Sequence, residues 1–319
     1  MAFDFQERKK AVEAELTARG VSAEQAETVA DCFVTADAYG VTTHGTAVLS
    51  AHLSRIQNNG YNLTPAFKIL RETAAFAVID GDNAMGPVSA TYCMKYAMER
   101  CKKSGIFTVF SRNNNTFGPA FYYPLLAARE GLIGIAYSNS PAQMAPIGGK
   151  EKLLGTNPFS IVVPNGDEPI ILDMATSVVA KSKFKEYKAA GKPLPEGWAL
   201  DKDGKPTTDP DEAMQGLVLP MAGFKGYGIA MMIDILSGVL SGAAYLNKVG
   251  RFYTEDGTCM NVGFNFIAID PKQILGEAYD EVIKDFVKTI RESEAVECGK
   301  ICLPGDDRRE YFKKQGRKK

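Results

Sequence analysis

Short apolar runs alternate with amphipathic stretches between residues 76 and 173, and few folds accommodate such a pattern. The stretches at 88–103 and 120–130 have the spacing of amphipathic helices, and a glycine lies just beyond each of them. Five apolar runs have the length and composition of buried strands: FAVID (76–80), IFTVF (106–110), LIGIAYS (132–138), PFSIVV (158–163) and PIILD (169–173). Strands separated by helices predict an α/β sheet in which at least some strands pair in parallel.

Helices are also expected on both sides of this region. Ser22 and Gln25 are spaced as a capping box, in which each side chain satisfies a backbone donor of the other, and the box opens a helix that ends near Tyr39. A second helix is expected from about Thr43. Further along, the pattern predicts helices at 178–190, 228–241 and 277–293, a strand at 264–270 and a long structured loop at 191–215.

Composition excludes several classes of function. Lys and Arg total 37 against 38 Asp and Glu, whereas nucleic-acid binding needs a basic excess. With only two histidines, a histidine-rich metal site is close to excluded, and we expect no metal. The six cysteines include no C-x-x-C pair, which indicates reduced thiols. The N-terminus has no apolar run, and the most apolar stretch, 229–239, is too short to span a bilayer, so we expect a cytoplasmic protein without a membrane or nucleic-acid partner.

His44 is the first candidate for chemistry. It lies between Gly40 and Gly45, in the first turn of an expected helix, where exposed N–H groups disfavour the imidazolium and keep a neutral imidazole available near about pH 7. The other interpretation makes Thr43 the N-cap of that helix and His44 a surface residue. The second histidine, His52, lies inside a helix and is interpreted as a packing residue.

The segment GFKGYG (223–228) leads into an apolar helix. Glycines before a helix N-terminus bring backbone donors to an anion, and Lys225 adds a charge, so the segment is a candidate cradle for a phosphate or carboxylate. Its G-x-x-G-x-G spacing is neither the dinucleotide fingerprint nor a P-loop. A tight turn between packed elements explains the same glycines equally well.

Small polar residues follow three of the expected strands, at 138–141, 155–158 and 173–177. In open α/β sheets, ligands collect beyond the carboxyl ends of strands. Asp173 could orient and stabilise a protonated histidine, as a carboxylate does in hydrolytic triads. The alternative is that Asp173 and Ser177 only cap the next helix.

Several long motifs occur in a specific order: GVTTHG (40–45), NTFGPAFYY (115–123), LLGTNPFSIVVP (153–164), LDMATSVVAKSK (172–183), PEGWALDKDGKPTTDP (195–210), GFKGYGIAMMIDILSGVLSGA (223–243) and CLPGD (302–306). With these motifs, the chain resembles the second type of malate/L-lactate dehydrogenase family, which includes ureidoglycolate and sulfolactate dehydrogenases, 2,3-diketogulonate reductase and piperideine-2-carboxylate reductase. The resemblance runs from about Asp37 to Gly305.

The resemblance implies an α/β fold that is not a Rossmann fold, with a central mixed sheet flanked by helices and a helical lobe. Residues 1–70 together with 271–319 would form the helical lobe, and residues 71–270 the central domain that binds the nicotinamide cofactor. The resemblance also implies a homodimer with its active sites near the subunit interface.

The implied activity is hydride transfer between NAD or NADP and a small 2-oxo or 2-hydroxy acid, or a sugar-derived analogue, with no metal. His44 would be the general acid/base, and Asp173 would support its charged form. Three residues would touch the substrate: Thr43, Thr116 and Thr156. The residues implied to hold the cofactor are Ser140, Asp173, Met174, Ala175, Thr176, Phe224, Lys225, Pro304 and Gly305. Lys181, Lys183 and Lys185 are candidates to meet the 2′-phosphate of NADP.

Three positions depart from the family pattern, the mildest being Thr43, where many members have a serine. Many members have an arginine four residues after the histidine, where this chain has Val48, and many have a histidine where it has Thr116. A valine cannot replace a bidentate arginine–carboxylate contact, and Arg55 lies too far along the helix to do so. Either another cation grips the substrate, or the substrate is less acidic or sugar-derived. Two further alternatives are reduction of a cyclic imine and a catalytically silent protein that keeps the cofactor site.

Overall fold

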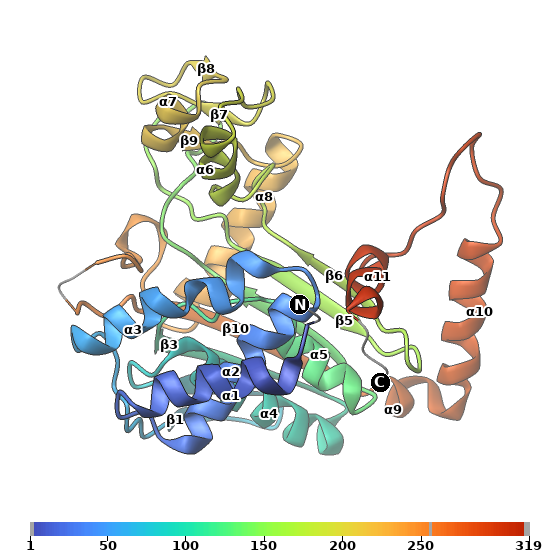
Figure 1. Cartoon of the computed structure of the whole chain (residues 1–319). Helices are drawn as coiled ribbons and strands as arrows, with labels where there is room; N and C mark the ends of the chain where they lie inside the picture. The colour runs from blue at the N-terminus through green and yellow to red at the C-terminus, as the bar shows by residue number, and fades with distance from the viewer. Residues whose placement is uncertain (1–2, 255–256, 316–319) are drawn as a thin grey trace.

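The computed structural model describes residues 3–254 and 257–315, and its main element is a seven-stranded mixed sheet (Figure 1). The strands are β1 (Lys68–Glu72), β2 (Phe76–Asp80), β3 (Ile106–Asn114), β4 (Ile133–Ser138), β5 (Phe159–Val163), β6 (Ile170–Met174) and β10 (Val262–Ile269). Their order is β1-β2-β3-β10-β4-β5-β6. Only β2 and β3 pair in parallel, and the other neighbours are antiparallel. The predicted α/β sheet is therefore confirmed, with its parallel pairing limited to one step.

Helices cover the sheet and build the core. They are α1 (Phe5–Thr17), α2 (Ala23–Ala38), α3 (Leu49–Gln57), α4 (Gly86–Ser104), α5 (Tyr122–Arg129), α6 (Ser182–Ala189), α7 (Pro210–Gln215), α8 (Phe224–Ile233), α9 (Pro271–Leu275), α10 (Tyr279–Arg291) and α11 (Asp306–Lys314). Helix α4 connects β2 to β3 and packs on β3 and β10, and α2 packs on α4. Phe33 of α2, Met94 of α4 and Phe266 of β10 are fully buried in one hydrophobic cluster.

Two predictions at the N-terminal helices are only partly right. Ser22 accepts a hydrogen bond from the Gln25 amide at 3.3 Å, but the Gln25 side chain donates to the carbonyl oxygen of Leu63, so half of the capping box forms. The helix expected from Thr43 begins instead as two 3-10 turns, Thr42–His44 and Thr46–Val48, before α3.

Residues 191–215, predicted as a loop, contain two short strands and a helix. Strands β7 (Ala199–Leu200), β8 (Pro206–Thr207) and β9 (Leu217–Val218) form a second sheet in the order β8-β7-β9. Together with α6 and α7, this sheet makes a small lobe above the main sheet (Figure 1). The strands are two residues long, so no alternating pattern could reveal them.

The C-terminal part of the chain returns to the N-terminal part at one helix. The ring of Phe312 in α11 lies 4.8 Å from that of Tyr39 at the end of α2. Helix α10 lies apart from the body, beside α9 (Figure 1). The segment 68–72, mostly within the predicted helical lobe, is strand β1 of the main sheet. Across the described residues, no helix has both the length and the apolar character needed to cross a membrane.

Candidate active site

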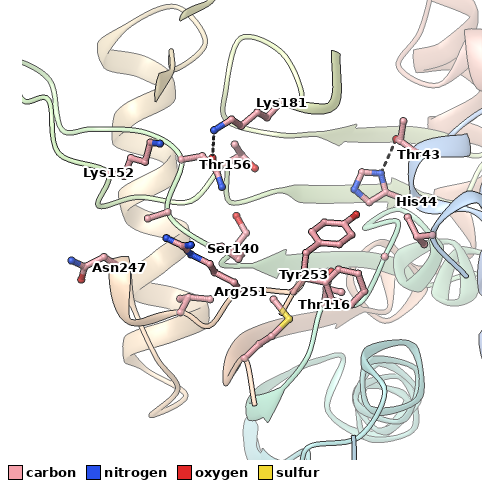
Figure 2. Close-up of a pocket in the computed structure, with 18 of the residues that line it drawn as sticks. Thr43, His44, Thr116, Ser140, Lys152, Thr156, Lys181, Asn247, Arg251 and Tyr253 are labelled. Carbon is pink, nitrogen blue, oxygen red and sulfur yellow. Dashed lines mark hydrogen bonds between the residues drawn. The ribbon is translucent and has the colours of Figure 1, made fainter. Parts of the chain in front are cut away.

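A cavity of about 620 Å³ opens beside the two 3-10 turns, at one edge of the main sheet (Figure 2). It is lined by Thr43, His44, Val48, His52, Thr116, Gly118, Ser140, Pro141, Ala142, Gln143, Lys152, Thr156, Lys181, Asn247, Val249, Arg251, Phe252, Tyr253 and Met260. Six residues singled out in the sequence meet here: His44, Thr43, Thr116, Thr156, Ser140 and Lys181. A volume of this order is typical of a small-molecule or cofactor site.

The turn that carries His44 is held by a buried carboxylate. Asp37, only 5% exposed, accepts hydrogen bonds from the amide and hydroxyl groups of Thr46, the latter at 2.5 Å. Gly45 lets the chain pass close to this carboxylate, because a Cβ there would lie 1.9 Å from Asp37 Oδ1. The glycine after the histidine is therefore required by packing, and the turn presents His44 to the cavity (Figure 2).

The imidazole of His44 favours its neutral form. Its Nδ1 is hydrogen-bonded to the Thr43 hydroxyl at 3.0 Å (Figure 2). Solvent reaches the ring through the cavity, but the surrounding protein desolvates it and lowers its pKa below 6.5, and the positive charge of Arg308 lowers this pKa further. The neutral imidazole was predicted from a helix N-terminus. The structure instead has a single 3-10 turn there, so desolvation by the surrounding protein and the charge of Arg308 replace that explanation.

Asp173, at the end of β6, is paired with Arg308. Its Oδ2 lies 2.9 Å from Arg308 Nη1, and its carbonyl oxygen accepts a hydrogen bond from Arg308 Nη2 at 3.0 Å. Burial raises the pKa of the Asp173 carboxyl, while Arg308 acts to lower it. Among the described residues, no hydrogen bond joins Asp173 to His44. The charged group that shifts the pKa of His44 is thus Arg308 and not Asp173, and the sequence did not predict a role for Arg308.

The pairing of β4, β5 and β6 brings residues expected to hold the cofactor to the same edge of the sheet. Tyr137 of β4 pairs with Phe159 of β5, which pairs with Met174 of β6, so the end of β4, the start of β5 and the end of β6 share one edge. Beyond this edge, the Ser140 amide donates to Asn157 Oδ1 at 3.0 Å. The amide and hydroxyl of Thr176 both donate to the carbonyl oxygen of Thr156 at 2.9 Å. The buried Thr176 therefore joins the loop after β6 to the loop before β5.

Two other predicted segments lie along the same flank. The Met221 amide donates to the carbonyl oxygen of Thr176, which places the N-terminus of α8, with the exposed Phe224 and Lys225, near β6. The Ile171 amide donates to the carbonyl oxygen of Pro304 at 3.0 Å. Gly305 has φ +87°, and a Cβ there would lie 2.7 Å from Ile171 Cβ, so glycine is needed at this close approach.

These flanking residues do not line the 620 Å³ cavity; of the residues expected to hold the cofactor, only Ser140 does. Packing also explains a glycine of the segment 223–228, in agreement with the alternative that these glycines form a tight turn between packed elements. A Cβ on Gly226 would lie 2.4 Å from the carbonyl oxygen of Met221. The site therefore has two parts. One is the cavity at His44, and the other is the surface beside β6 formed by residues 173–176, 224–225 and 304–305, here called the flank of β6.

Sequence reasoning missed most of the cavity's charge. Lys152 and Arg251 line it together with Lys181, and no Asp or Glu lines it in the part of the chain that the structure describes. Burial lowers the pKa of Lys152, and nearby Arg251 lowers it further. Lys183 instead pairs with Glu186 at 2.7 Å, and Lys185 is exposed. This lining favours an anionic ligand over the less acidic substrate predicted from Val48 and Thr116.

Two further polar residues near the cavity, His52 and Arg55, have structural roles. His52, 1% exposed, is hydrogen-bonded through Nδ1 to the Tyr61 hydroxyl at 2.8 Å, which confirms its interpretation as a packing residue. Arg55, 2% exposed, donates to the carbonyl oxygens of Phe252 and Thr258 and to Asn115 Oδ1. It thereby holds the loop that carries Arg251 against α3.

Comparisons with known proteins agree over nearly the whole chain. A family model described as malate/L-lactate dehydrogenase matches residues 3–318. A malate dehydrogenase of Pyrococcus horikoshii is 42% identical over 287 residues, 87% of this chain and 79% of the relative. A ureidoglycolate dehydrogenase (NAD(+)) of Escherichia coli is 35% identical over 302 residues, 93% of this chain and 85% of the relative. The solved structure of a sulfolactate dehydrogenase from Methanocaldococcus jannaschii superposes with a TM-score of 0.92 at 38% identity and covers 98% of this chain and 91% of that one.

Proposed function

Because the chain belongs to the malate/L-lactate dehydrogenase family, we propose that it transfers a hydride between its nicotinamide cofactor and a small 2-oxo or 2-hydroxy acid at the His44 cavity. It is an oxidoreductase that acts on a CH–OH group and uses NAD or NADP. One observation carries the choice of substrate class: among the described residues, an imidazole and three cations line one cavity, and none of the residues that line it is acidic.

His44 is the general acid/base in this proposal. Its Nδ1 is engaged by Thr43, which leaves Nε2 to exchange a proton with the substrate oxygen. The hydroxyl groups of Thr116 and Thr156 line the cavity and are proposed, with Thr43, to contact the substrate. The bound nicotinamide accepts or supplies the hydride.

The cofactor is proposed to lie along the flank of β6, with its nicotinamide end toward Ser140 and the cavity. Two donors there suit phosphates and ribose: the Ser140 hydroxyl and the exposed ammonium of Lys225 at the N-terminus of α8. Met174 and Ala175 are partly exposed on the same flank. Asp173, Thr176, Phe224, Pro304 and Gly305 complete the proposed set of residues that hold the cofactor.

We also propose that the chain forms a homodimer. Two helical surfaces support this proposal, because each exposes a row of apolar side chains to solvent. The apolar positions of α10 recur at helical spacing, and Val282 and Phe286 on this face are 51% and 55% exposed. A second stripe follows α8 and the π-helical segment Asp234–Val239, where Met232 and Val239 are 47% and 48% exposed. Faces of this kind typically mark subunit contacts.

Two measurements test the enzymatic proposal. Fluorescence titration with NADH and NADPH should show saturable binding of one or both. His44→Ala should lose turnover by about a hundredfold or more and still bind the cofactor. Ser50→Ala, an exposed change on α3, is the control and should leave both unchanged. Nucleotide binding without turnover would favour the catalytically silent alternative, failure to bind either nucleotide would contradict the proposed function, and full activity of His44→Ala would remove His44 from the reaction.

A further inference from the structure

Three cationic side chains come together at the end of the cavity that faces away from His44. Figure 2 shows Lys152, Arg251 and Lys181 across the cavity from Thr43 and His44. They come from three separate segments of the chain: Lys152 from the loop before β5, Lys181 from the segment before α6 and Arg251 from the loop before β10. Their meeting is therefore a property of the fold and not of a local basic run.

Within residues 3–254 and 257–315, no acidic side chain pairs with any of these cations. Lys181 Nζ donates to Gln143 Oε1 at 2.8 Å, and Lys152 Nζ donates to the carbonyl oxygen of Gln215 at 2.8 Å. Both acceptors are neutral, and each ammonium keeps two further N–H groups. Arg251 makes no hydrogen bond or ion pair with any residue in the described part of the chain.

Holding these groups together is unfavourable without a ligand. Burial and the charge of Lys152 lower the pKa of Lys181 to about 8, and burial and Arg251 lower that of Lys152. Proteins normally relieve such repulsion by pairing each cation with a carboxylate. An oxyanion bound between the three side chains would relieve the repulsion in the same way and would accept charge-assisted hydrogen bonds from them.

We propose that Lys152, Lys181 and Arg251 form an oxyanion subsite that binds a carboxylate, sulfonate or phosphate group at the end of the cavity opposite His44. The residues proposed for the cofactor lie along β6 and, apart from Ser140, outside this cavity. The geometry therefore favours a second anionic group of the substrate, remote from the reacting carbon, as the occupant. That assignment of the occupant rests on the proposed function, whereas the anion binding itself does not.

Calorimetric titration with inorganic phosphate, in a low-salt buffer without other polyvalent anions, tests the subsite without any turnover. The variants are Arg251→Met and Lys152→Met, and the control is Lys150→Met, an exposed change two residues from Lys152. We expect the wild type and the control to bind phosphate alike and each subsite variant to bind it about tenfold or more weakly, since a lost hydrogen bond to a charged group has that effect.

Steady-state kinetics then identifies the source of the anion. If the substrate supplies it, Arg251→Met should raise the KM for the dianion 2-oxoglutarate about tenfold or more and leave the KM for pyruvate and the Kd of the nucleotide unchanged. If a cofactor phosphate supplies it, the Kd of NADH or NADPH should rise instead.

Two other results have separate meanings. Unchanged phosphate affinity in both variants, with unchanged KM and nucleotide Kd, would overturn the subsite. Weakened phosphate binding in a protein that reduces no 2-oxo acid would leave the subsite standing and contradict only the proposed function.

Discussion

Arg308 pairs with Asp173 across 135 residues of sequence, and the pair fastens the C-terminal helix α11 to the end of β6 beside His44. The ion pair is 2.9 Å long, and the two side chains are 20% and 11% exposed. The guanidinium also lies 5.3 Å from the ring centroid of Phe121 in a cation–π arrangement. One side chain thus joins three parts of the chain and adds a positive charge near the proposed acid/base, where it lowers the pKa of His44 less than desolvation does.

Replacing Arg308 should affect both stability and the pH profile. Arg308→Met leaves the buried Asp173 carboxyl without its partner, and we expect a loss of about 3 kcal/mol in the free energy of unfolding. The pKa of His44 should rise, because the positive charge that lowers it is gone. Urea unfolding and the pH dependence of kcat/KM measure these effects. Arg308→Lys, which keeps the charge, should preserve the pH profile better than the methionine variant, and an equal change in both would contradict this account.

The two directions of the reaction should depend on pH in opposite ways. The pKa of His44 lies below 6.5, so at neutral pH the imidazole is neutral and can take a proton from a hydroxy acid. Oxidation should therefore be level above about pH 6.5 and fall in acid, whereas reduction, which needs the protonated ring, should fall as the pH rises. Profiles of kcat/KM in both directions test this. A midpoint in the free enzyme well above 6.5 would show that the cavity does not disfavour the imidazolium.

His52 should make the fold sensitive to acid. Burial, helped by Arg55, lowers its pKa to about 3 from 6.5. Below pH 6.5 the unfolded chain therefore takes up a proton that the native state refuses, so stability falls as the pH drops toward 3. At about pH 5 the loss is roughly 2 kcal/mol. Urea unfolding at pH 7.5 and 5 should show that wild type loses about this much more than His52→Gln. Parallel losses in the two proteins would assign the acid sensitivity elsewhere.

The proposed dimer can be tested at α10. Phe286 is 55% exposed on the apolar face of this helix, and Phe286→Glu should weaken dimerisation about a hundredfold or more, because it would bury an unpaired charge in the contact. Lys284→Glu changes a charge on the polar face and is the matched control. Light scattering after gel filtration measures the mass, and circular dichroism checks the fold. A monomeric wild type, or a fully dimeric Phe286→Glu, would contradict the assignment.

Local pattern predicted the strands that are buried on at least one face. Strand β2 alternates half-buried and buried residues, and β10 is buried at most positions, so their apolar runs were visible in the sequence. All five residues of β1 are exposed, which leaves no alternation to detect. The position of β10 between β3 and β4 depends on pairing across the whole chain and has no local signal.

The site divides in the same way. The motif around His44 and the loop at Thr156 were predicted because each lies in a contiguous motif of the family, and the loop at Ser140 because small polar residues follow an expected strand there. Arg308 and Arg251 were not, because each reaches the site through a return of the chain that no short segment encodes. The reason for the neutral imidazole was also missed, since it depends on a charge that is distant in sequence.

The dependence of the site on α11 sets the timing of its assembly. During synthesis, β6 leaves the ribosome long before Arg308 exists, so the sheet can form while Asp173 still lacks its counter-ion. The exposed segment 292–300 is the connection, here called the tether, through which α11 later reaches the end of β6. A protease that cut this tether would leave the seven strands covalently intact, and only noncovalent contacts would then hold the helix that bears the guanidinium. Dissociation of that helix would give His44 the electrostatics of an unfinished chain, a change that an assay of the sheet alone would not detect.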